Sequence, residues 1–180
     1  MAVVVVGGGS RGVGKTALLC GVIGALPEMQ WIAVKIAGHE HGLELPVWEE
    51  SVPGEGTDTA RYLAAGARRA FLLTAADGSE IKVALGGFWD RVERNANLLI
   101  ESNRVLEIVR PDLCLMVQSD ADIAEAKASF DNVSGLADAV IIPGTANEFR
   151  DGAQPEFVLA RLELISPELE HWIRGRLIYG

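Results

Sequence analysis

The sequence has little cysteine, no long apolar run and a shortage of basic residues. Its two cysteines, Cys20 and Cys114, both lie in apolar runs, which predicts buried thiols rather than a disulfide framework. No apolar stretch reaches the roughly 18 residues that a membrane-spanning helix needs, so we expect no such helix. The first residues also lack the basic region of a secretory signal peptide. These absences favour a cytoplasmic protein.

The charge balance excludes two classes of partner. Asp and Glu number 25 against 16 Lys and Arg, which gives a formal net charge of −9 with neutral histidines. Because nucleic acids are bound through clustered Lys and Arg, we expect no nucleic-acid partner. An anionic membrane surface is disfavoured for the same reason. The 49% hydrophobic content and the length of 180 residues indicate one folded domain.

Apolar runs of strand length alternate with segments of helical period along the chain. This alternation predicts an α/β fold with three layers, in which helices cover both faces of a mostly parallel sheet of about six strands. We expect strands over residues 2–6, 31–37, 69–75, 98–101, 113–117 and 139–142. We expect helices over residues 14–26, 58–65, 79–94, 105–109, 122–137, 155–165 and 167–177. The remaining long segments, 38–56 and 145–154, are interpreted as loops, the first of them lid-like.

Glycine is concentrated near the start of the chain. Seven of the 20 glycines lie between Gly7 and Gly24, and the segment Gly-Ser-Arg-Gly-Val-Gly-Lys-Thr fits the phosphate-loop pattern G-x-x-x-x-G-K-[ST]. Such a loop turns its backbone N–H groups inward around phosphates, and the following helix adds the positive end of its dipole. The lysine binds the β- and γ-phosphates, and the threonine hydroxyl binds Mg²⁺. We therefore expect GTP or ATP to be bound by Gly9, Ser10, Arg11, Gly12, Val13, Gly14, Lys15, Thr16 and Ala17.

Three charged residues are further candidates for the same site. Glu101 ends an apolar strand, where a carboxylate can bind the metal or orient the attacking group. Asp58 stands at a helix start after the long loop, where it is a candidate for binding a metal-linked water and for capping the helix, two roles that are compatible. Lys35 interrupts an apolar strand, and a position facing the phosphates would explain its charge. The candidate catalytic residues are thus Lys15, Glu101 and Asp58, and the candidate magnesium ligands are Thr16, Glu101 and Asp58.

Other polar residues compete less well for these roles. Asp112 and Asp120 are acids near a strand, but Asp112 precedes its strand and should therefore lie at the opposite edge of the sheet. His39-Glu40-His41 places two imidazoles beside a carboxylate, which is compatible with a metal site or with a polar loop.

Several segments follow one another in the order seen in one family of P-loop NTPases. After the phosphate loop come Val34-Lys35, then Gly56-Thr57-Asp58-Thr59-Ala60-Arg61, and then Leu99-Ile100-Glu101. In these segments the chain resembles the molybdopterin-guanine dinucleotide biosynthesis protein B family, over roughly residues 1–142. The resemblance implies a GTP-binding accessory NTPase of molybdenum-cofactor biosynthesis, with a protein of that pathway as partner.

Three functions remain open from the sequence. The first is a Mg²⁺-dependent NTPase with slow or partner-dependent hydrolysis, the second a small-molecule kinase, and the third a non-catalytic nucleotide-binding module. We favour the first, because no basic cluster for an acceptor is visible outside the phosphate loop apart from Arg68-Arg69. The sequence leaves the base and the oligomeric state open, including a homodimer.

Overall fold

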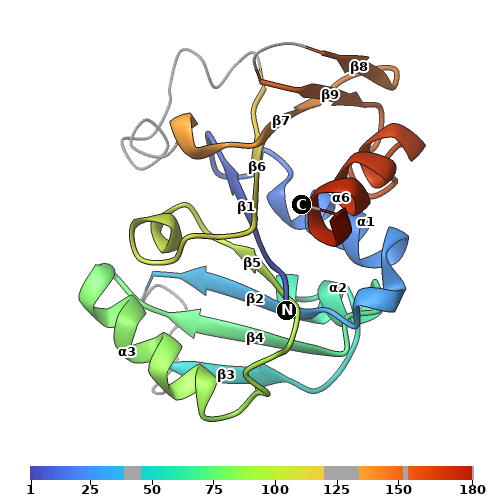
Figure 1. Ribbon diagram of the computed structural model, residues 1–180. Coiled ribbons are helices and arrows are strands. Elements are labelled where there is room, and N and C mark those ends of the chain that lie inside the picture. The colour runs from blue at the N-terminus through green and yellow to red at the C-terminus, as the bar shows by residue number, and fades with distance from the viewer. Residues whose placement is uncertain (39–45, 120–133, 152–153, 180) are drawn as a thin grey trace.

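The computed structural model describes residues 1–38, 46–119, 134–151 and 154–179, and these form an α/β fold around one twisted sheet (Figure 1). Within the described residues the sheet has nine strands in the order β3-β4-β2-β5-β1-β6-β7-β9-β8. The strands are β1 (Val3–Gly8), β2 (Ile32–Ala37), β3 (Val47–Glu50), β4 (Arg69–Thr74), β5 (Leu98–Glu101), β6 (Leu113–Val117), β7 (Ala139–Pro143), β8 (Glu148–Arg150) and β9 (Glu156–Leu159).

The sheet is mostly parallel, as the alternating pattern predicted. All neighbouring strands from β4 to β9 pair in parallel, and only the two outermost strands, β3 and β8, run antiparallel to their neighbours. The central strand β1 lies between β5 and β6, so its carboxyl end meets the carboxyl ends of both. Ligands of such sheets bind at this carboxyl edge.

Helices cover both faces of the sheet, which gives three layers. The helices are α1 (Lys15–Ala25), α2 (Asp58–Ala64), α3 (Gly78–Trp89) and α6 (Pro167–Tyr179), with 3-10 turns η1 (Pro27–Met29), η3 (Arg104–Glu107) and η4 (Ser134–Leu136). One apolar cluster joins the sheet to α1, α2 and α6, and a second cluster joins the opposite face to α3 and η3. The two faces are therefore buried by different helices.

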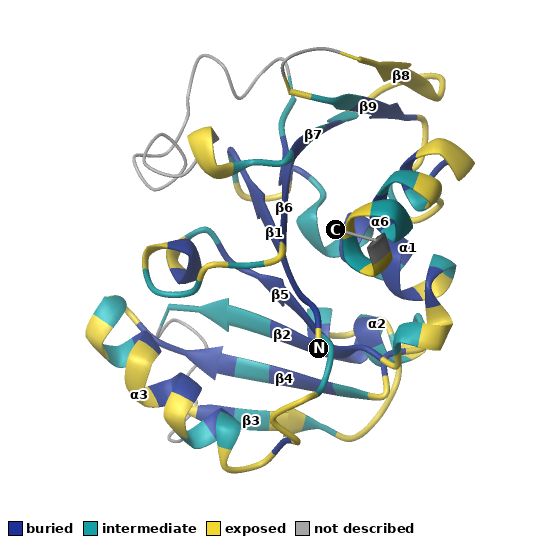
Figure 2. Cartoon of the chain, viewed as in Figure 1, coloured by how far each residue is buried: buried dark blue, intermediate teal, exposed yellow. Residues whose placement is uncertain are grey.

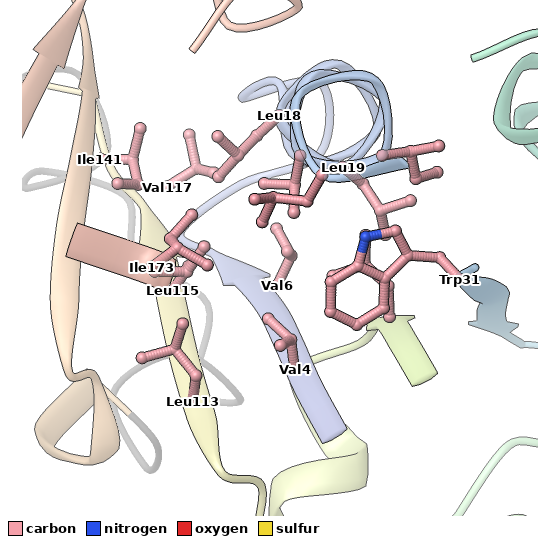
Figure 3. Close-up of a cluster of buried hydrophobic side chains, with 14 of the residues drawn as sticks. Val4, Val6, Leu18, Leu19, Trp31, Leu113, Leu115, Val117, Ile141 and Ile173 are labelled. Atoms are coloured by element: carbon pink, nitrogen blue, oxygen red, sulfur yellow. The ribbon is translucent and has the colours of Figure 1, made fainter. Parts of the chain in front are cut away.

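Alternation along β1 divides its side chains between these two clusters. Val4 and Val6 belong to the cluster under α1, whereas Val3 and Val5 belong to the cluster on the α3 side. Figure 3 shows Leu18 and Leu19 of α1 lying over Val6, and both leucines are fully buried. Burial of such a side chain contributes about 1.5–3 kcal/mol. The phosphate loop is thus anchored at both ends, by a buried strand before it and a buried helix after it. In Figure 2 the three central strands β1, β5 and β6 are dark blue, whereas the edge strand β8 is yellow.

Three sequence predictions of local structure are wrong, and all concern strands near a sheet edge. Residues 155–165 were expected to be helical, but β9 forms there, because Phe157 and Leu159 are buried and the segment pairs with β7. The expected loops 38–56 and 145–154 contain β3 and β8. The sheet therefore has nine strands rather than about six, since an open edge supplies hydrogen-bond partners that the local sequence does not reveal.

Some expectations fall on residues outside the described part. The predicted helix 122–137 lies largely in 120–133, and the His39-Glu40-His41 segment lies in 39–45. Both cysteines are free thiols, with Cys114 buried and Cys20 partly buried. Burial raises the pKa of Cys20 to about 11 and that of Cys114 to about 12. None of the helices in the described part of the chain is both long and apolar enough to span a bilayer.

Candidate functional site

The phosphate-loop segment connects the end of β1 to the start of α1 with two glycines in the left-handed backbone region. Gly12 has a φ of +83° and Gly14 a φ of +109°, values that residues with a Cβ rarely adopt. A Cβ on Gly14 would also overlap the side chain of Leu162, which packs over the loop. Glycine at position 14 is therefore required both by the backbone turn and by the packing.

Lys15 and Thr16 open α1 directly beneath this loop. The ammonium of Lys15 donates a hydrogen bond to the carbonyl oxygen of Ser10 at 2.7 Å, which folds the side chain back over the loop. The hydroxyl of Thr16 donates to the carboxylate of Glu101 at 2.8 Å. Since Thr16 lies in the first turn of α1, the helix N-terminus, an ammonium and a carboxylate come together at one point.

Glu101 is the centre of a network of side chains from four elements. It ends β5, is 5% exposed, and stands in register with Val6 of β1 and Lys35 of β2. Besides Thr16, its carboxylate accepts hydrogen bonds from the ammonium of Lys35 at 3.1 Å and from the hydroxyl of Tyr62. The strand end predicted from the sequence therefore brings Glu101, Lys35 and Thr16 together.

Lys35 also forms an ion pair with Asp58, and the carboxylates of Asp58 and Glu101 together stabilise its charged ammonium form. Burial alone would lower the pKa of Lys35, but Glu101 and Asp58 more than offset that effect and raise it. Burial alone would raise the pKa of Asp58, but the ion pair with Lys35 lowers it, with help from Thr16 and Arg61. The ammonium and the Asp58 carboxylate therefore stabilise one another in the charged form.

Asp58 is not the helix cap. The N-cap of α2 is Thr57, whose side chain accepts the N–H of Ala60 at 3.1 Å, and Asp58 is the first residue of the helix. Its carboxylate is consequently directed to Lys35, and it lies on the wall of the cleft beside the phosphate loop.

Tyr62 was missed by the sequence analysis. It is a residue of α2 with a fully buried side chain, and its hydroxyl donates to the Glu101 carboxylate. Burial raises the pKa of this phenol well above its ordinary value, and the negative charge of Glu101 raises it further. The one signal in the sequence is spacing, because Tyr62 follows Asp58 by four residues and so lies on the same face of α2.

An open cleft of about 760 Å³ extends from the phosphate loop over the carboxyl ends of β2, β4 and β5. It adjoins a smaller hollow of about 200 Å³ with which it shares Lys15, Glu101 and Arg104. The walls of the larger cleft carry five cations, namely Arg11, Lys15, Lys35, Arg61 and Arg104, but two carboxylates, Asp58 and Glu101. Among the described residues, cations therefore outnumber carboxylates on the walls of this cleft.

The basic cluster visible in the cleft differs from the one expected. Arg68 and Arg69 lie elsewhere and pair with Glu93 and Glu49. Arg61 on α2 and Arg104 at the start of η3 instead face the cleft. The sequence shows no such cluster, because Arg61 and Arg104 are far apart in sequence and come together only in the fold.

The structure brings most, but not all, of the predicted nucleotide-binding residues to the cleft. Ser10, Arg11, Gly12, Gly14, Lys15 and Thr16 line it or the adjoining hollow. Val13 is instead buried in the core, Ala17 does not line the cleft, and the N–H of Gly9 is bonded to the carbonyl of Val117. Asp112 accepts the N–H of Val3 at 2.8 Å at the opposite edge of the sheet, as its place before the strand predicted.

Comparison with solved structures confirms the fold. The chain is similar to LpxK from Aquifex aeolicus, determined in complex with ATP, with a TM-score of 0.59 and 14% sequence identity. The alignment covers 88% of this chain and 53% of LpxK, so the chain spans about half the length of that protein. It also aligns with the cell division protein MinD from Aquifex aeolicus, with a TM-score of 0.45, 16% identity and coverage of 79% of this chain and 69% of MinD.

No protein-family model matches the sequence, and no curated protein is similar to it. The resemblance to the molybdopterin-guanine dinucleotide biosynthesis protein B family therefore rests on the short sequence segments alone.

Proposed function

We propose that this chain binds a nucleoside triphosphate together with Mg²⁺ and cleaves its terminal phosphate. One observation carries the proposal: the Thr16 hydroxyl and the Glu101 carboxylate lie 2.8 Å apart, beside Lys15, at the mouth of an open cleft. Phosphoryl transfer is catalysed mainly by positioning and by neutralising charge, and this arrangement supplies both.

The oxygen atoms at this point suit magnesium. Mg²⁺ prefers hard oxygen ligands and keeps several of its waters, so few protein ligands are needed. The Thr16 hydroxyl and the Glu101 carboxylate would hold it, with Asp58 reaching it through water. When bound, Mg²⁺ supplies positive charge that stabilises the departing phosphate oxygens.

The chain's own residues would divide the remaining work. Backbone N–H groups at the start of α1, together with its dipole, bind the phosphates. Lys15 exchanges its contact with the Ser10 carbonyl for a phosphate oxygen, because an anion is a stronger acceptor than a neutral carbonyl. Lys35 neutralises Glu101 and Asp58 while no metal is present, and Tyr62 fixes the orientation of the Glu101 carboxylate.

ATP is the proposed nucleotide, with GTP as the alternative that the sequence resemblance implies. ATP is the ligand of the similar structure of LpxK. A single-turnover assay with excess protein and γ-labelled nucleotide tests both. We expect Mg²⁺-dependent release of phosphate, faster from ATP than from GTP and abolished by EDTA. Faster release from GTP would overturn the choice of base. Tight binding of either nucleotide without cleavage would instead favour the non-catalytic module.

The molybdenum-cofactor role is a narrower proposal that the short matching segments support. Under this proposal the chain is an accessory NTPase that works with a protein of that pathway. The test is co-purification of the chain with molybdopterin or with a molybdenum-cofactor biosynthesis protein in the presence of Mg²⁺ and nucleotide. Absence of both from the purified complex would remove this proposal and leave nucleotide cleavage untouched.

A further inference from the structure

The cleft carries a charge opposite to that of the whole protein. The chain has a net charge of −9, yet the described residues lining the cleft include five cations and two carboxylates. Net charge governs long-range behaviour, whereas a locally basic cleft concentrates anions in it. The excess of cations among the described lining residues therefore favours an anionic ligand in this cleft.

The proposed nucleotide site uses some of these cations but not all. Lys15 lies on the phosphate loop, and Lys35 is already matched by Glu101 and Asp58. Arg61 approaches Asp58 at 3.9 Å, with both side chains about one-third exposed, which is a weak pair. Arg104 donates to the carbonyl oxygen of Ala76 at 2.7 Å, and no carboxylate among the described residues pairs with it.

The two arginines line the same cleft as the phosphate loop but come from other elements. Thr16 and Glu101 would hold the metal of the proposed nucleotide site, so the terminal phosphate would lie close to Glu101. Arg61 comes from α2 and Arg104 from η3, the turn that follows β5 and Glu101, and both line the cleft. A second molecule in this cleft would therefore have two guanidinium groups outside the phosphate loop among its walls.

We propose that Arg61 and Arg104 bind a second ligand, a small molecule that carries a phosphate or carboxylate group, beside the terminal phosphate of the nucleotide. The proposal rests on the nucleotide site proposed above and names the chemical class of its second substrate. Guanidinium groups suit this role, since they bind the oxygen pairs of phosphates and carboxylates with two parallel hydrogen bonds. A cleft of about 760 Å³ has room for such a molecule as well as for phosphates.

Three matched probes test the proposal on the full chain. The protein is saturated with Mg²⁺ and a non-hydrolysable ATP analogue, so that the phosphate loop is filled. Glycerol 3-phosphate, glycerate and glycerol are then titrated separately by calorimetry. We expect one or both of the anionic probes to bind and glycerol not to bind. The comparison of glycerol 3-phosphate with glycerate shows whether phosphate or carboxylate is preferred. Equal behaviour of all three probes would overturn the proposal.

A double variant locates the binding. Arg61→Gln/Arg104→Gln should weaken binding of the anionic probe at least about tenfold, since charged hydrogen bonds contribute about 1.5–3 kcal/mol. Arg94→Gln/Arg110→Gln, at two exposed positions outside the cleft, is the matched control and should bind as the parent does. Equal binding by the double variant would overturn the assignment. Arg104→Gln alone keeps the test informative if the change beside Asp58 lowers the amount of folded protein.

Failure of the nucleotide site is recognised separately. If the ATP analogue itself does not bind, the proposed function is wrong. Glycerol 3-phosphate is then titrated into the protein alone, where dependence on Arg61 and Arg104 still supports the anion site and independence of both overturns it.

Discussion

The two ends of the parallel strands use their polar side chains in different ways. At the amino ends, Asn97, Asp112 and Asp138 each accept a backbone N–H, from Ala2, Val3 and Cys114, all at 2.8 Å. At the carboxyl ends, Asn103 likewise accepts the N–H of Gly8 at 2.9 Å, but the Glu101 carboxylate bonds to other side chains, those of Thr16, Lys35 and Tyr62. The amino-end side chains supply acceptors for backbone N–H groups of the strands, whereas the side chains around Glu101 bond mainly to one another.

This difference separates the polar side chains that complete the sheet from those of the proposed site. A side chain that accepts a backbone N–H satisfies a group that folding would otherwise leave unpaired. Buried charges that bond to one another cost desolvation energy and contribute little net stability. Their presence around Glu101 is therefore best explained by a ligand, and perturbed charged groups in a cleft are typical of functional sites. Variants at the two edges should accordingly fail in different ways.

The largest expected effect is on turnover, at the carboxyl edge. Glu101→Gln keeps the size of the side chain but removes the charge that would hold Mg²⁺. We expect the single-turnover rate of nucleotide cleavage to fall about 10- to 100-fold, as for other changes around metal sites. The rate is measured across Mg²⁺ concentrations, where the variant should need more metal. An unchanged rate at every Mg²⁺ concentration would show that Glu101 is not part of the site.

Tyr62→Phe tests the buried side of the same network. Loss of the hydroxyl leaves an oxygen of buried Glu101 with one partner fewer, which should lower the free energy of unfolding by about 1–3 kcal/mol. Urea unfolding measures this directly, with an unchanged m-value as the sign of a simple loss of stability. A variant as stable as the parent would indicate that the phenol is only packed against Glu101.

Asp112→Ala is the matched change at the amino edge. It removes the acceptor for the N–H of Val3, so we expect a loss of about 0.5–1.5 kcal/mol in the free energy of unfolding. Nucleotide cleavage measured on the same sample should stay at the parent rate, because Asp112 lies at the other end of the sheet. A slower rate of nucleotide cleavage with an unchanged free energy of unfolding would contradict the structural role assigned to Asp112 at the amino edge.

The smallest expected effect is a pH dependence that belongs to the carboxyl edge. The pKa values of Lys35 and Tyr62 are raised in the folded protein, so their stabilising contribution is complete below about pH 10, near their unfolded pKa values. It is lost as the pH rises toward the folded values. Urea unfolding from pH 8 to 11 should show a decline that is smaller in Lys35→Met. An equal decline in both proteins would place its origin elsewhere.

Sequence reasoning predicted the parts of the site that local pattern determines. The glycines, Lys15 and Thr16 form a contiguous motif, and Glu101 and Lys35 are charged residues on apolar strands that end at one edge. Arg61 and Arg104 were not predicted, because their convergence depends on how α2 and η3 sit on the sheet.

The strand β9 shows a second limit of the sequence. Its apolar spacing suits a helix, yet the segment forms a strand because it pairs with β7, from which β8 separates it in the chain. Helical propensity is a weak preference that such tertiary contacts override. The same reason accounts for β3 and β8, which exist through their edge partners.

Calorimetric titration of Mg·ATP into the parent protein and into Lys15→Ala tests the central claim most directly, with Lys82→Ala on the exposed face of α3 as control. We expect the parent and Lys82→Ala to bind with equal affinity, and Lys15→Ala to bind about 10- to 100-fold more weakly without loss of stability, because it loses charged hydrogen bonds to phosphate. Equal affinity in all three proteins, or no binding by the parent, would contradict the claim that the carboxyl edge is a nucleotide site.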